Sequence, residues 1–79
     1  MVSVEVYDSE RRAQTLVAIK YVRQLRGLGL AAATRLIDEV YYDRHPITLA
    51  FGSRSEACAF AEHMSTLGFS CRLMAETER

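Results

Sequence analysis

The sequence contains no tryptophan, one proline and only two cysteines among its 79 residues. A disulfide-stapled scaffold is therefore not expected. Both cysteines lie inside apolar stretches, which predicts buried thiols in a reducing compartment. No apolar run approaches the length of a membrane-spanning helix, and the first ten residues lack the apolar centre of a signal peptide. We therefore expect a cytoplasmic protein without a membrane segment.

A net charge is also absent, because ten Lys and Arg residues balance ten Asp and Glu residues. The balance does not hold locally, since residues 1–10 contain three acids and no base, and residues 38–79 contain seven acids and four bases. Residues 11–37 contain no acid and six bases, which are Arg11, Arg12, Lys20, Arg23, Arg26 and Arg35. This distribution predicts a neutral molecule with one positive face.

Hydrophobic residues make up 49% of the chain, enough for residues 1–79 to fold as one domain. Alternating apolar residues predict strands at 2–7, 47–51 and 69–74. Helical periodicity predicts helices from about 13 to 26, from about 30 to 40, and from Ser53 or Ser55 to about 67. Residues 8–12 and 41–45 are expected to be loops, with Asp8 or Ser9 as a candidate helix cap. Residues 75–79 are expected to form a frayed tail.

This order of elements, βααβαβ, predicts the α+β class. Three strands interrupted by helices are too few for a doubly wound sheet. We therefore expect a two-layer sandwich, in which a three-stranded antiparallel sheet carries all three helices on one face.

The first predicted helix has apolar residues over more of its circumference than a one-sided stripe requires. The stripe expected to face the domain contains Val17, Ala18, Tyr21, Val22 and Leu25. A second stripe beside it contains Leu16, Ile19, Lys20 and Arg23. We therefore expect Leu16 and Ile19 to be exposed next to two cations.

Residues 27–29 are expected to form the turn between the first two helices. Gly27 suits the left-handed conformation that follows many helix ends, Leu28 can then turn inward, and Gly29 permits close approach of the next helix.

The sequence contains no arrangement expected to support catalysis or to hold a metal or cofactor. His45 and His63 lie on different predicted elements, and with Cys58 and Cys71 they do not form a metal-ligand spacing. The Gly-Leu-Gly-Leu segment at 27–30 lacks the Lys and Ser/Thr of a phosphate-binding loop. We expect a protein that is not an enzyme.

The segment Ile19-Lys20-x-Val22-Arg23-x-x-x-Gly27-Leu28-Gly29-Leu30 resembles the C-terminal domain of the bacterial large-subunit ribosomal stalk protein, the seven/twelve protein. The similarity extends over most of the chain. It implies the βααβαβ fold and a helix pair that recruits translational GTPases, including elongation factors Tu and G. It also implies that Ile19, Lys20 and Arg23 contact the factor, with Leu16 in place of a smaller aliphatic residue.

The predicted partner-binding residues therefore lie on the first helix pair and its turn: Leu16, Ile19, Lys20, Arg23, Arg26, Gly27, Leu28, Gly29 and Arg35. The cations would steer the encounter, and the aliphatic residues would supply the buried contact. A solvated helix face is the alternative interpretation, since charged residues are usually exposed. RNA phosphates rank below a protein partner, because no aromatic platform accompanies the cations and the net charge is zero.

A second, more distant resemblance gives an alternative function. The segment Ala33-Thr34-Arg35-Leu36-Ile37-x-x-Val40 is similar to a helix of the ClpS adaptor of N-end-rule proteolysis. It implies delivery of proteins to a protease, with Asp8 and Glu10 as candidate carboxylates for a substrate α-amino group. The stalk protein dimerises through a separate N-terminal helical domain that has no counterpart in these 79 residues. A fragment and a free-standing relative both stay open, as does the oligomeric state.

Overall fold

The computed structural model describes residues 2–75. Its elements follow the order β1 (Val2–Ser9), α1 (Thr15–Arg26), α2 (Leu30–Tyr41), β2 (Ile47–Phe51), α3 (Arg54–Thr66) and β3 (Phe69–Ala75). The strands form one antiparallel sheet in the order β2-β1-β3. The predicted α+β class and βααβαβ order are therefore confirmed. Ala75 belongs to β3, and the rest of the predicted tail lies outside the described residues.

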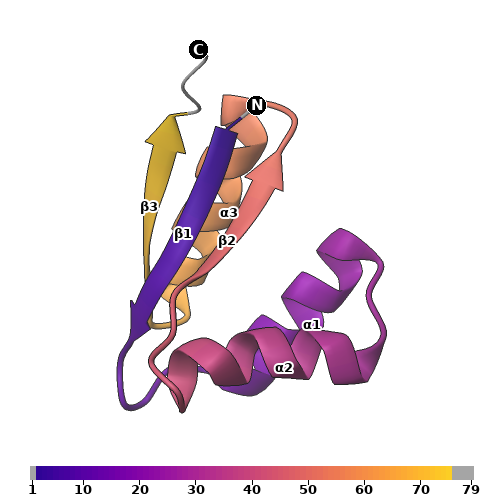
Figure 1. Ribbon diagram of the computed structural model, residues 1–79, viewed down its shortest axis with the longest axis vertical. Helices are drawn as coiled ribbons and strands as arrows, with labels where there is room; N and C mark the ends of the chain where they lie inside the picture. The colour runs from indigo at the N-terminus through magenta and orange to yellow at the C-terminus, as the bar shows by residue number, and fades with distance from the viewer. Residues whose placement is uncertain (1, 76–79) are drawn as a thin grey trace.

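The helices bury their apolar residues against one face of the sheet. In Figure 1, α3 lies behind the strands, and the α1–α2 hairpin lies across their lower end. The other face is open, and Thr48, Ala50 and Arg72 are exposed there. No helix in the described part of the chain has the length and apolar character needed to cross a membrane.

Strand β1 lies at the centre of the sheet and is longer than predicted. Its pairing with β3 shifts by one residue between Val6 and Asp8, so Tyr7 is the extra residue of a β-bulge. The bulge resets the alternation, and Ser9 is buried again. The predicted loop at 8–12 is therefore wrong for Asp8 and Ser9, which pair with β3.

The core is a single cluster to which every element contributes. Phe60 on α3 lies at its centre, with its ring stacked on Tyr21 at 5.8 Å between centroids and tilted against Phe51 at 5.1 Å. Burial of a large apolar side chain of this kind stabilises a fold by roughly 1.5–3 kcal/mol. The buried hydrophobic residues are Val4, Val6, Ala18, Ile19, Val22, Ala33, Ile37, Val40, Ile47, Phe51, Ala57, Phe60, Met64, Leu67 and Phe69.

The helix ends show why the chain turns where it does. Helix α3 begins after Ser53, whose Oγ accepts a hydrogen bond from the Glu56 N–H at 3.2 Å. Gly27 ends α1 with φ +64°, as predicted, and its N–H donates to the Arg23 carbonyl. Gly68 has φ +98°, and a Cβ there would lie 2.9 Å from the Cα of Ala13.

The start of α1 differs from the prediction. Its N-cap residue is Gln14, and no side chain caps the helix. Asp8 and Ser9 cannot serve as caps because both still belong to β1. The approach to α1 is instead fixed by the end of α3, since the Gln14 N–H donates to the Leu67 carbonyl at 2.8 Å.

Candidate protein-interaction surface

Helix α1 turns a different face toward the core than its apolar pattern predicts. Ala18, Ile19 and Val22 are buried, whereas Val17 and Leu25 are 42% and 44% exposed. The prediction that Ile19 is exposed is wrong, since only 7% of it is accessible.

The position of α2 explains this difference. The Tyr21 ring faces α3, where it lies 4.0 Å from the His63 ring between centroids. Ile19 projects from the other side of the helix. Helix α2 packs against α1 after the Gly27 turn, and because Ile19 is buried on the side away from Tyr21, we infer that α2 covers that side. Two neighbouring helices therefore cover two sides of α1, and the remaining side meets solvent.

The uncovered side of α1 carries a short row that we call the α1 row: Leu16, Lys20 and Arg23. These residues are spaced at i, i+4 and i+7, which places them along one side of the helix. Leu16 is exposed as predicted, with 75% of its surface accessible. Lys20 and Arg23 line an open hollow together with Gln24, Gly27 and Leu28. The ion pairs within residues 2–75 involve neither Lys20 nor Arg23.

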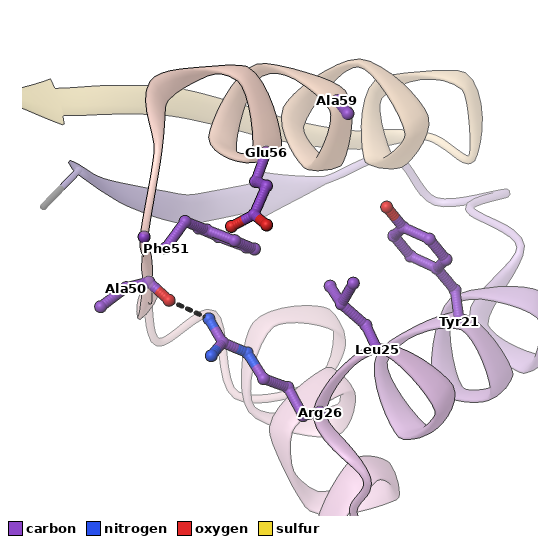
Figure 2. Close-up of a pocket in the computed structure, with 8 residues that line it drawn as sticks. Tyr21, Leu25, Arg26, Ala50, Phe51, Glu56 and Ala59 are labelled. Carbon is purple, nitrogen blue, oxygen red and sulfur yellow. Dashed lines mark hydrogen bonds between the residues drawn. The ribbon is translucent and has the colours of Figure 1, made fainter.

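The structure separates the other two predicted cations from the α1 row. Arg26 leaves the end of α1 toward the sheet, where its Nη2 donates to the Ala50 carbonyl and its guanidinium carbon lies 4.6 Å from the centroid of the Phe51 ring (Figure 2). Arg35 lines a different hollow, on α2, beside the acidic residues Asp38, Glu39 and Asp43. The predicted patch of four cations is therefore corrected to a pair, Lys20 and Arg23.

The turn between α1 and α2 places its three apolar and glycine residues differently. Leu28 is half-buried against the core, and Gly29 is exposed with no atom within 4 Å of the position a Cβ would take. The close approach expected at Gly29 is therefore not observed. Leu30 begins α2 and is 57% exposed. The first buried residue of α2 is Ala33, three positions further along the helix.

A second feature lies between α1, β2 and α3 and was not predicted from the sequence. It is a half-open groove of about 300 Å³ with apolar walls from Tyr21, Leu25 and Phe51. Arg26 and Glu56 also line it, and Figure 2 shows both side chains extending toward its centre. Burial raises the pKa of the Tyr21 phenol above its ordinary value. No sequence pattern indicated the groove, because its walls come from three separate segments.

Asp8, one of the two carboxylates of the alternative adaptor site, already accepts hydrogen bonds within the domain. The Oδ1 of Asp8 accepts a hydrogen bond from Arg44 Nη1 at 2.7 Å and another from the Ser9 N–H at 2.8 Å. Arg44 Nη1 also donates to the Ser9 carbonyl at 3.2 Å. A substrate ammonium would have to compete with Arg44 for Asp8.

The two cysteines are half-buried rather than fully buried, and both are free thiols. Burial raises the pKa of the Cys71 thiol to about 11. Among residues 2–75, no group of three or more His, Cys, Asp or Glu side chains is placed to hold a metal ion.

No protein-family model matches the chain, and a search of curated proteins finds no match either. The resemblance to the ribosomal stalk domain and the weaker resemblance to ClpS therefore stay predictions.

The corrected phase of α1 makes a prediction about stability. Replacing Ile19 with Ala should lower the free energy of unfolding by about 2–5 kcal/mol, because it opens a cavity in the core. Replacing Leu16 with Ala removes an exposed side chain and should change it by less than about 0.5 kcal/mol. Urea unfolding followed by circular dichroism measures both. Equal losses for the two variants would contradict the observed orientation of the helix.

The raised pKa of Cys71 makes a prediction about its reactivity. The thiolate is the nucleophile, so at pH 8 only about one Cys71 in a thousand should be reactive. In a Cys58→Ser variant, the rate of alkylation by iodoacetamide should rise about tenfold for each pH unit up to pH 11. Mass spectrometry measures the rate. A plateau near pH 9 would show that the thiol is not shielded by the core.

Proposed function

We propose that this chain is a non-enzymatic protein-interaction domain that binds an acidic protein surface through the α1 row. One observation carries the proposal. Leu16 is 75% exposed, in line with Lys20 and Arg23, which form no ion pair within the described chain. Within residues 2–75, most of the Leu16 side chain is therefore accessible and no carboxylate pairs with either cation.

The two kinds of side chain in the α1 row would contribute differently to binding. Complementary charge raises the rate of encounter and selects the partner, but exposed ion pairs add only about 0–1 kcal/mol each. The affinity therefore has to come from burial of Leu16, together with the neighbouring half-exposed Val17, in an apolar pocket of the partner. A fitting partner presents such a pocket bordered by Asp or Glu side chains.

The resemblance to the ribosomal stalk domain supports a translational GTPase, such as elongation factor Tu or G, as the partner. Lys20 and Arg23 stand at positions where that family contacts its factors, and both lie in the exposed row. Ile19 stands at a third such position and is buried. We therefore assign it the task of holding the helix in place, and assign direct contact to Leu16. A related machine of the cytoplasm is the broader form of the same proposal.

The two alternatives receive less support from the geometry. The adaptor function requires a free carboxylate at the end of β1, where Asp8 is paired with Arg44. Binding to RNA requires several cations on one surface, whereas Arg26 and Arg35 lie apart from the α1 row.

A charge reversal in the row tests the proposed function. Arg23→Glu should weaken binding to a purified elongation factor by at least roughly tenfold, or about 1.4 kcal/mol, because it places an acid opposite an acidic surface. Leu16→Ser should weaken it as well. Fluorescence anisotropy with the labelled domain measures the dissociation constants for factors Tu and G.

Arg54→Glu is the matched control, since it makes the same charge change at an exposed position on α3. It should bind like the wild type. Equal binding by all four proteins, or equal weakening by Arg54→Glu and Arg23→Glu, would remove the α1 row from the interaction. Capture of peptides with a free bulky N-terminus, lost in Asp8→Ala with Glu10→Ala, would favour the adaptor function instead.

A further inference from the structure

We propose that the free edge of β2 is a pairing site for β2 of a second copy of this chain, and that Arg26 holds this edge closed. The proposal does not depend on which partner the α1 row binds. It starts from the order of the sheet, in which β2 is an outer strand bordered by β1 on one side only.

The contact with Arg26 identifies the backbone groups that are left unpaired. The Ala50 carbonyl points toward α1, where it accepts from Arg26 Nη2 (Figure 2). In an antiparallel strand, the N–H and C=O of one residue point to the same side, and alternate residues share that side. Thr48 therefore also directs its N–H and C=O to the free edge, while Leu49 bonds to β1.

These unpaired groups suit a second copy of the same strand. A two-fold axis through Leu49 places Thr48 of one copy opposite Ala50 of the other, and each such pair exchanges two N–H···O bonds. Leu49 then meets its own copy, and Phe51 comes opposite Ile47. The apolar row that faces the core continues across both sheets.

The charge distribution favours this occupant over a foreign peptide. Strand β2 contains no charged residue, so its edge offers no charge that would select a particular foreign segment, and it does not repel itself. The whole chain has zero net charge, which adds no long-range repulsion between copies. The other outer strand, β3, carries Arg72, and charges on edges discourage pairing.

Arg26 is the residue that opposes this pairing. Its guanidinium lies over the Phe51 ring and donates a hydrogen bond to the Ala50 carbonyl. A second strand would need this carbonyl as an acceptor. The contact is a hydrogen bond to a neutral acceptor at the surface, and Arg26 takes part in no ion pair within residues 2–75. Its removal is therefore expected to free the edge and to take one contact away from the Phe51 ring.

Sedimentation equilibrium of the purified chain tests the proposal. Arg26→Ala should form a dimer with a dissociation constant at least roughly tenfold lower than that of the wild type. Arg12→Ala removes the same charge from an exposed loop residue and should behave like the wild type. Adding Thr48→Pro to Arg26→Ala should restore the monomer, since proline removes an N–H that faces the free edge.

Amide hydrogen exchange gives a second measurement that does not require the proline variant to fold. In the wild-type monomer, the Thr48 and Ala50 amides should exchange rapidly and the Leu49 amide slowly. In the Arg26→Ala dimer, Thr48 and Ala50 should become protected. Three results would overturn the proposal: a folded Arg26→Ala variant no more dimeric than the wild type, oligomers in which these amides stay unprotected, or protection that arises only in a complex with another protein.

Discussion

The structure depends on how α1 is held between two neighbouring helices. Its apolar residues extend around much more than half of the helix, and a domain of 79 residues has too few elements to cover them all. Contact between Tyr21 and Phe60 fixes the side toward α3, and the Gly27 turn brings α2 against the side of Ile19. Leu16 and the two cations of the α1 row are on the side that is left. The proposed binding surface is thus the side of α1 that neither α2 nor α3 covers.

The fold was predictable from local patterns. Alternation at β1 and β2 and helical periodicity at α1, α2 and α3 were each strong enough to place the element and give its order. Gly27 marked the end of α1 correctly, and the cap of α3 is Ser53, one of the two serines predicted, because capping and left-handed turns depend on one residue and its immediate neighbours. The bulge at Tyr7 was not predictable, since it depends on how β1 pairs with β3.

The candidate site was predictable only in part. The absence of acids from residues 11–37 predicted one positive face, but only Lys20 and Arg23 lie together, next to the exposed Leu16. The predicted buried side of α1 was wrong, since Ile19 is buried in place of Val17. The sequence has two apolar stripes on this helix, and the position of α2 decides which of them is buried. Arg26 and Arg35 lie apart from Lys20 and Arg23 because of tertiary contacts that the sequence does not reveal. A long side chain reaches whatever acceptor the tertiary fold places nearby, and spacing along the chain does not contain that information.

One measurement tests the central claim most directly. An isotope-labelled sample titrated with an unlabelled elongation factor should show amide chemical-shift changes and line broadening concentrated at Leu16, Lys20 and Arg23, on the uncovered side of α1. The open face of the sheet, represented by Thr48 and Arg72, should be unaffected. Changes confined to that face, or to the end of β1 near Asp8, would contradict the account and place the interaction elsewhere.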